Sequence, residues 1–158
     1  MKLKFREANI NDLDAINKIA WQMHELHVGW RPDLYRSHDI VVSEAYLTDL
    51  FNVGLVFVGE SDLHVLCYAI CFIREITIPI LVQRKVMFID AFGVTEEYRR
   101  SGIGKQFLDY IKNYALDNKC SQIDLQVMSC NKQARAFYLD CGMQEKALIM
   151  ELPLNKDN

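Results

Sequence analysis

Glycines and basic residues gather between an apolar run at residues 86–94 and an amphipathic run that begins at Ile103. The residues of this stretch that could bind a ligand are Arg99, Arg100, Gly102, Gly104 and Lys105. Glycine lets backbone N–H groups approach a ligand without obstruction by a Cβ atom, and a helix N-terminus attracts anions. Each such contact is worth only about 0.3–1 kcal/mol at a wet surface, so several amides and cations must act together. We therefore expect residues 99–105 to hold a pyrophosphate.

A strand and a helix must position this loop. Residues 86–94 are apolar except for Asp90 and form too short a run for a buried helix, which predicts a central strand. Beyond the loop, apolar residues recur with the spacing of one helical face, at Ile103, Phe107, Leu108, Ile111 and Ala115. The loop is thus expected at a helix N-terminus.

Three kinds of glycine loop compete here. A Walker loop fails because Gln106 follows Gly104-Lys105, and a dinucleotide loop fails because Phe107 stands where its third glycine would be. The pattern that fits is Arg/Gln-x-x-Gly-x-Gly after an apolar strand, met by Arg99, Gly102 and Gly104. Here the chain resembles the GNAT superfamily of acetyl-CoA-dependent N-acetyltransferases, in which this loop holds the CoA pyrophosphate.

A second block extends the resemblance. A predicted strand at residues 122–128 is followed in order by Asn131, Ala134, Phe137, Tyr138 and Gly142. The family's second motif likewise has an Asn that opens a short helix, a buried alanine, a Phe-Tyr pair near the helix end and a glycine that stops it. The two motifs cover roughly the C-terminal half of the chain. The alternative is that the glycines only open a helix and the aromatics only fill a core.

The resemblance implies contacts to the cofactor. Phe92, Gly93 and Val94 match the strand end that exposes backbone groups to the pantetheine arm and the thioester oxygen. Asn131 matches the residue that anchors the pantetheine region, a role compatible with that of a helix cap. The full set expected to bind acetyl-CoA is Phe92, Gly93, Val94, Arg99, Arg100, Ser101, Gly102, Ile103, Gly104, Lys105, Asn131 and Tyr138.

Two residues are candidates for catalysis. Attack on a thioester needs a neutral amine, and deprotonating a lysine-like amine at pH 7 costs roughly 4.6 kcal/mol. Asp90 is the only carboxylate of its strand and could act as the base, directly or through water. Regular alternation places it on one face with Phe88 and Phe92, although a bulge would change that face. The alternatives are a structural hydrogen bond or deprotonation through ordered water alone. Tyr138 matches the family's phenol that points at the CoA sulfur as a general acid.

The acceptor side is expected in residues 21–35, which are rich in aromatic, histidine and charged side chains. In the resemblance this region forms one wall of the acceptor site. The candidate contacts are His24, Glu25, His27, Trp30, Asp33 and Tyr35. For each of them a surface or packing role is the alternative. A metal site is not expected, because His24 and His27 lack a third ligand nearby.

The rest of the chain predicts one domain, residues 1–158, of mixed α/β class. Further strands are expected at residues 2–6, 54–59, 63–77 and 144–154, and further helices after a cap at Asn11 or Asp12 and at residues 43–52. The resemblance implies a GNAT-type central sheet of six to seven strands flanked by about four helices.

Composition excludes several classes of function. A net charge of −3 and a pI near 5.8 give no attraction to nucleic acid, and no apolar run is long enough to span a membrane. The five cysteines lack metal-type spacing and fit a reducing compartment, so a cytoplasmic protein is expected.

Two functional hypotheses remain. The first is an N-acetyltransferase that moves the acetyl group of acetyl-CoA directly to a primary amine, either a small molecule or a peptide or protein. The second is a non-catalytic acyl-CoA-binding module with a regulatory or partner role. A homodimer is compatible with both, since the edge of the final predicted strand could supply a contact.

Overall fold

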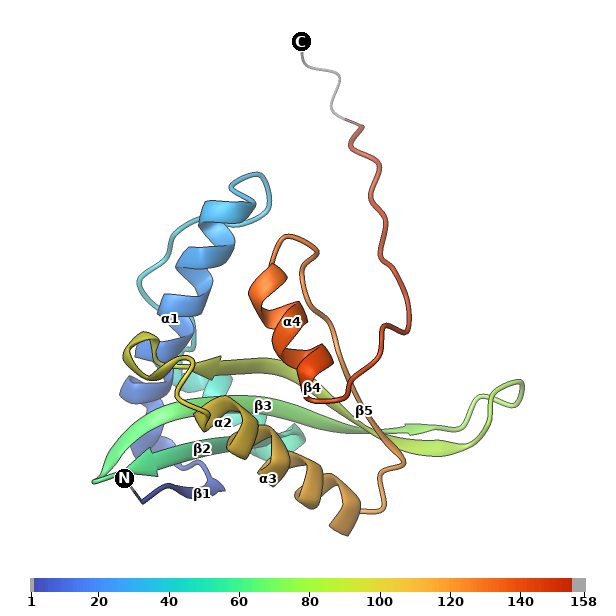
Figure 1. Ribbon diagram of the computed structural model, residues 1–158, viewed down its shortest axis with the longest axis horizontal. Helices are drawn as coiled ribbons and strands as arrows, with labels where there is room; N and C mark the ends of the chain where they lie inside the picture. Colours follow the sequence, from blue (N-terminus) through green and yellow to red (C-terminus); the bar gives the residue numbers. More distant parts are fainter. Residues whose placement is uncertain (1, 155–158) are drawn as a thin grey trace. The chain divides into compact units, whose positions relative to one another are not determined.

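The computed structural model describes residues 2–154, and the chain divides into two compact units, residues 1–126 and 127–158. The first unit contains one sheet with the strand order β1-β2-β3-β4-β5 (Figure 1). Its strands are β1 (Lys4–Glu7), β2 (Leu55–Ser61), β3 (His64–Ile76), β4 (Arg84–Val94) and β5 (Gln122–Leu125). All neighbours are antiparallel except β4 and β5, which are parallel. A parallel pair needs a crossover, and the chain between β4 and β5 supplies it.

Three helices cover the two faces of this sheet. The helices are α1 (Leu13–Trp30), α2 (Glu44–Val53) and α3 (Ile103–Asp117). One core joins buried residues of α1 and α2, such as Ile16 and Leu47, to Val58 and Ile70 of the sheet. On the other face Phe107 of α3 is fully buried between Phe5 and Phe92, with both ring centroids 5.4 Å away. The apolar face predicted for this helix is confirmed, because all five of its residues are buried.

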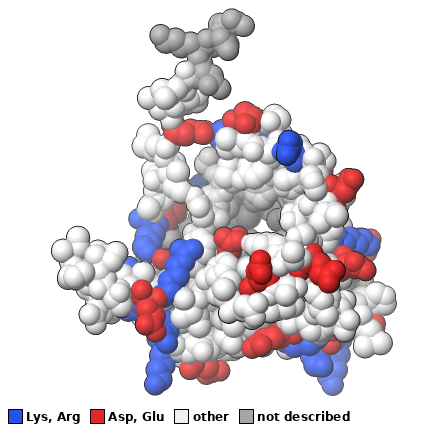
Figure 2. Space-filling model, turned by 180° about the vertical axis from the view of Figure 1, so that it is seen from behind, with Lys and Arg blue, Asp and Glu red and all other residues white. Residues whose placement is uncertain are grey.

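The hairpin of β3 and β4 is longer than the strands beside it. Pairing with β2 ends at Cys71, and pairing with β5 begins at Val86, so the outer part of the hairpin is a two-stranded arm. Its apolar tip stands out to the right in Figure 1 and to the left in Figure 2. Exposed apolar residues of the tip are Ile78, Ile80, Leu81 and Val82.

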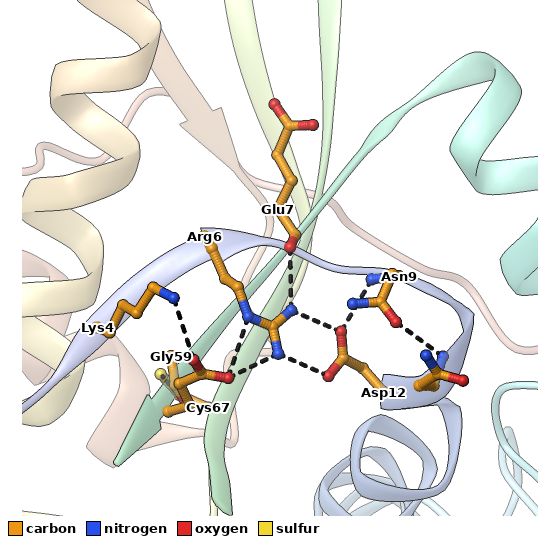
Figure 3. Close-up of polar contacts among 9 residues, drawn as sticks. Lys4, Arg6, Glu7, Asn9, Asp12, Gly59 and Cys67 are labelled. Atoms are coloured by element: carbon orange, nitrogen blue, oxygen red, sulfur yellow. Dashed lines mark hydrogen bonds and ion pairs between the residues drawn. The ribbon is translucent and has the colours of Figure 1, made fainter. Parts of the chain in front are cut away.

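Charged side chains fasten β1 to the turn before α1 (Figure 3). The Arg6 guanidinium donates to both carboxylate oxygens of Asp12, at 2.8 and 2.9 Å, and to Glu60 of β2 at 2.6 Å. Asp12 also accepts from the backbone N–H of Asn9 at 2.8 Å, completing a capping box on the 3₁₀ turn η1 (Ile10–Asp12). Asp12 stands at the N-cap position of α1 as predicted, but its side chain makes no capping bond to that helix.

The second unit contains α4 (Lys132–Asp140). The Asn131 side chain accepts from the N–H of Ala134 at 3.0 Å, so its role as a helix cap is confirmed. Gly142 has a φ of 88°, a left-handed conformation that suits glycine after a helix.

The prediction of a final strand at residues 144–154 is wrong. These residues contain no strand, and their large apolar side chains are exposed. An apolar run predicts a strand, but a strand also needs a neighbour for its peptide groups, which a sequence pattern does not provide. The described residues therefore form five strands instead of the expected six to seven. None of the described helices is long and apolar enough to cross a membrane.

Candidate functional site: the loop at the start of helix α3

The predicted phosphate loop lies between the end of β4 and the start of α3. The chain leaves Val94, forms the 3₁₀ turn η2 (Glu96–Tyr98) and enters α3 at Ile103. Arg100 and Gly102 both have left-handed backbones, with φ of 62° and 85°. A left-handed conformation strains any residue other than glycine, so Arg100 is held there by its surroundings. The hydroxyl of Ser101 donates to the carbonyl of Tyr98 at 2.5 Å and helps to hold the turn.

Several N–H groups at this helix start have no carbonyl partner within α3. The N–H of Gln106 is the one that reaches the carbonyl of Gly102, at 3.2 Å, and Gly102 provides no side-chain cap. The N–H groups of the first turn therefore face outward, together with the positive end of the helix dipole. Ser101, Gly102 and Lys105 are exposed there, whereas Ile103 is buried and anchors the helix. This arrangement suits an anion.

Arg99 has a supporting place in the loop. Its Nε donates to the carbonyl of Val94 at 3.1 Å, and its guanidinium lies 3.7 Å from the sulfur of Met23 in α1. A second contact from α1 is made by the Gln22 side chain, which accepts from the N–H of Glu96 at 3.0 Å. Sequence reasoning missed the support from Gln22 and Met23, because nothing in a helical pattern indicates which distant loop a polar side chain will reach.

Gly93 is required by packing on one face of β4. A Cβ atom at this position would lie 2.9 Å from the ring of Tyr68, 3.1 Å from Ile19 and 3.3 Å from Met23. The glycine therefore lets α1 and β3 come close to the strand end. The expected contact of Phe92, Gly93 and Val94 with a pantetheine arm stays a prediction.

Asp90 lies on a β-bulge. Ile70 is opposite Ala91 and Cys71 is opposite Ile89, so Asp90 is the extra residue of β4. The regular alternation that placed Asp90 with Phe92 is therefore wrong, because the extra residue changes the face. Phe92 contacts Phe107 of α3. The charge of Asp90 instead contributes to the raised pKa of Tyr46 in α2 and of Tyr68. Tyr68 belongs to the core under α1 and α2.

The charge of Asp90 also acts on the pKa of two tyrosines, Tyr46 and Tyr68. Burial raises the pKa of Tyr46, and the charge of Asp90 adds to the rise. Burial likewise raises the pKa of Tyr68, with Tyr46 and Asp90 contributing further. Asp90 itself is exposed. An exposed carboxylate can attract a cation and accept its proton. This influence of Asp90 was not predicted, because the sequence does not reveal the bulge.

The acceptor-side candidates contact one another and their own backbone. His24 hydrogen-bonds the carbonyl of Arg36 at 2.8 Å, and the hydroxyl of Ser37 donates to Glu25 at 2.6 Å.

Aromatic rings also meet at the end of α1. The ring centroid of His27 lies 5.5 Å from that of Trp30 and 5.2 Å from that of Tyr35. These contacts fasten residues 31–37 to the end of α1. Within that segment Arg31 forms a salt bridge with Asp33. The role of the acceptor-side candidates in binding an acceptor stays a prediction.

Asn131 and Tyr138 belong to the second unit. Asn131 caps α4, and the Tyr138 ring lies 5.1 Å from that of Phe137 between centroids. Their predicted contacts with CoA remain predictions. Among the described residues no cluster of three or more His, Cys, Asp or Glu side chains could hold a metal ion.

Comparisons with known proteins agree with this architecture. A point mutant of the BH1408 protein from Bacillus halodurans has a TM-score of 0.92 at 28% sequence identity, covering 96% of this chain and 99% of that chain. An aminoglycoside N-acetyltransferase solved in complex with CoA has a TM-score of 0.69 at 14% identity, covering 96% of this chain and 94% of that one. The fold is thus that of the GNAT-type acetyltransferases.

The family follows from the sequence itself. The model of the acetyltransferase (GNAT) family matches residues 14–143, and the chain belongs to this family. A thialysine N-epsilon-acetyltransferase from Bos taurus is 36% identical over 59 residues, which is 37% of this chain and 35% of that protein. The match therefore spans about a third of the length of this curated relative.

Proposed function

We propose that the protein is an N-acetyltransferase that transfers the acetyl group of acetyl-CoA directly to a primary amine. The observation that carries the proposal is the loop at the start of α3, where outward N–H groups, Gly102 and two cations meet. Membership of the GNAT family supports acetyl transfer as the chemistry. The curated relatives named for an ε-amine of a lysine analogue favour a small or peptidic amine as the acceptor.

The loop would hold the pyrophosphate of CoA. Arg100 and Lys105 are exposed and can approach a phosphate, while Arg99 holds the loop against the end of β4. The N–H groups of Gly104 and its neighbours would donate to phosphate oxygens at the helix start. CoA binding should therefore depend on Gly104, where a side chain would add bulk next to these donors.

Asp90 would receive the amine. A protonated amine is attracted to the exposed carboxylate on the bulge and has to lose a proton before it attacks the thioester. Asp90 would take this proton directly or through water. The hydroxyl groups of Tyr46 and Tyr68 are protonated at neutral pH, so they can donate hydrogen bonds near the carboxylate.

Tyr138 would act at the other end of the reaction. The attacking nitrogen forms a bond to the acetyl carbon, the bond from that carbon to sulfur breaks, and the sulfur leaves as a thiolate. The phenol of Tyr138 would donate a proton or a hydrogen bond to this sulfur. Because a thiol of pKa about 8.5 is a tolerable leaving group, loss of the phenol should slow the reaction without abolishing it.

A thiol-release assay tests this proposal. The protein is incubated with acetyl-CoA and a panel of primary amines, including lysine, thialysine, a polyamine and a peptide N-terminus. Tyr138→Phe should lower the turnover number by roughly a hundredfold, the low end of what a general acid contributes, with an unchanged affinity for acetyl-CoA. The matched control is Tyr110→Phe, whose ring packs against Phe57 and Phe107 and which should leave turnover unchanged.

The alternative function is a non-catalytic acyl-CoA-binding module. It would bind acetyl-CoA but release no CoA with any amine beyond the rate without protein. An equal turnover number in the wild type and in Tyr138→Phe would instead contradict the role of Tyr138 while leaving the acetyl transfer in place.

A further inference from the structure

The tip of the β3–β4 arm, residues 77–83, is a loop without a charged side chain. It extends beyond the rest of the sheet and is the white protrusion at the left of Figure 2. Its large aliphatic side chains are 44–90% exposed: Ile78, Ile80, Leu81 and Val82. A contiguous group of exposed aliphatic side chains marks a place where another molecule binds.

Part of the backbone of the tip is already hydrogen-bonded. The N–H of Leu81 donates to the carbonyl of Ile78 at 2.9 Å, and Nη1 of Arg84 donates to the carbonyl of Val82 at 2.9 Å. Pro79, which follows Ile78, has no N–H. A backbone group that enters an apolar medium without a partner costs free energy. These features therefore lower the cost of taking the tip out of water.

Cations lie directly behind the tip on both strands of the arm. Arg74 is near the end of β3, and Arg84 and Lys85 begin β4. The one carboxylate among residues 74–85 belongs to Glu75, which pairs with Lys85 at 3.6 Å. Residues 74–85 thus carry three cations and one carboxylate, although the whole chain has a net charge of −3. The arm is locally basic.

The shape and charge of the arm favour a lipid surface over a protein as its partner. A stable protein interface takes roughly 800 Å² from each partner, and four side chains at the end of a narrow arm are too few to supply it. A bilayer accepts a narrow projection because its lipids rearrange around it. Apolar groups at the tip and cations behind it also follow the order of an anionic bilayer, in which acyl chains lie beneath negative headgroups.

We propose that the tip of the arm inserts into the surface of an anionic bilayer, with Arg74, Arg84 and Lys85 at the level of the headgroups. Elements bound in this way place their apolar side chains roughly 5–10 Å into the boundary between headgroups and acyl chains. The contact needs no segment that crosses the membrane. The candidate loop for CoA follows Val94, at the opposite end of β4 from Arg84, so it lies away from the contact.

Sedimentation with lipid vesicles tests the inference. The protein is mixed with vesicles of phosphatidylcholine alone, or of phosphatidylcholine and phosphatidylserine in equal parts. The wild type should sediment with the anionic vesicles. Ile80→Asp should weaken this binding by at least roughly tenfold, because it replaces an inserted aliphatic side chain with a charge. The matched control is Leu63→Asp, which should bind like the wild type, because Leu63 is 94% exposed in the turn of the other hairpin.

The contribution of the cations is tested by Arg74→Gln. Arg74 is exposed, and its guanidinium lies 3.7 Å from the ring centroid of Phe88 on the same arm. Losing one cation at an anionic surface should weaken binding about fivefold. Arg36→Gln is the matched control, because Arg36 is exposed in the loop between α1 and α2 and should leave binding unchanged. An equal effect of the two variants would contradict the proposed orientation.

Hydrogen exchange on the wild type locates the contact. Anionic vesicles should slow amide exchange at residues 77–83 and leave the turn at Leu63 unchanged. No sedimentation of the wild type with anionic vesicles, or equal sedimentation of Ile80→Asp, would overturn the proposal. A wild-type mass above 18.4 kDa that falls to one chain in Ile80→Asp, without vesicle binding, would assign the tip to a protein contact instead.

The same variants separate this proposal from the proposed acetyl transfer. Ile80 is 90% exposed at the tip, so Ile80→Asp should fold normally and release CoA at the wild-type rate. Vesicle binding is measured without acetyl-CoA and without an amine. Failure of either activity therefore leaves the measurement of the other intact.

Discussion

At the scale of single residues, the ion pair between Arg6 and Asp12 connects β1 to the turn before α1. The Asp12 side chain is 8% exposed and that of Arg6 is 26% exposed. Removing one partner of such a pair leaves the other charge without compensation, whereas a pair in water contributes little. The sequence gives no indication of this contact, because Asp12 is also a good residue for capping a helix.

The variant Asp12→Asn should lower the free energy of unfolding by about 2–4 kcal/mol, because it removes a half-buried ion pair and weakens the capping box. Denaturation by urea at pH 7 measures this change. Asp33→Asn provides the control, since Asp33 also pairs with an arginine but its side chain is 58% exposed. An equal loss of stability in the two variants would contradict the importance of burial.

Stability should also depend on pH through this network. The Arg6 guanidinium holds the pKa of Asp12 and of Glu60 below their ordinary values. A carboxylate with a lowered folded-state pKa contributes stability above its unfolded pKa of about 4, and this contribution disappears as pH falls through the folded value. Urea melts from pH 6 to pH 2.5 should show a smaller acid-dependent loss in Asp12→Asn than in the wild type. An identical loss in both would show that Asp12 is not responsible.

At the scale of elements, helix α1 connects the core to the loop. It packs against β4 at Gly93 and reaches the loop region through Gln22 and Met23. Most elements of the first unit could be predicted from apolar runs and periodicity, and α3 buries all five residues of its predicted face. The bulge at Asp90 and the tie from Gln22 could not, because they depend on how separate elements meet.

Alanine substitutions at two glycines should change the free energy of unfolding in opposite directions. Gly93→Ala should lower the free energy of unfolding by about 1–3 kcal/mol, because the new methyl group would lie 2.9 Å from the Tyr68 ring. Gly29→Ala should instead raise it by about 0.5–1 kcal/mol, because Gly29 lies within α1 with no atom within 4 Å of its Cβ position. Thermal melts of both variants measure these changes. A Gly93→Ala protein as stable as the wild type would disprove the packing explanation.

At the scale of the whole molecule, the sequence indicated the family and the order of the elements, and the match to residues 14–143 agrees with it. The glycine loop was predictable because its residue types are dictated by backbone geometry. The sixth strand was not correctly predicted, since the apolar pattern of residues 144–154 is the same whether the strand has a neighbour or lacks one. An apolar pattern shows that a segment is able to form a strand. Whether the segment does form one depends on a neighbouring strand that can bond to its peptide groups.

The most direct test of the proposed function is a calorimetric titration of acetyl-CoA into the wild type and into Gly104→Glu. Gly104 is the second residue of α3, where a glutamate would place bulk and negative charge among the N–H groups proposed to hold the pyrophosphate. The matched control is Gly29→Glu, in open space within α1. We predict one binding site in the wild type and in Gly29→Glu, and no measurable binding in Gly104→Glu. Equal binding by Gly104→Glu, or none by the wild type, would contradict the assignment of the loop.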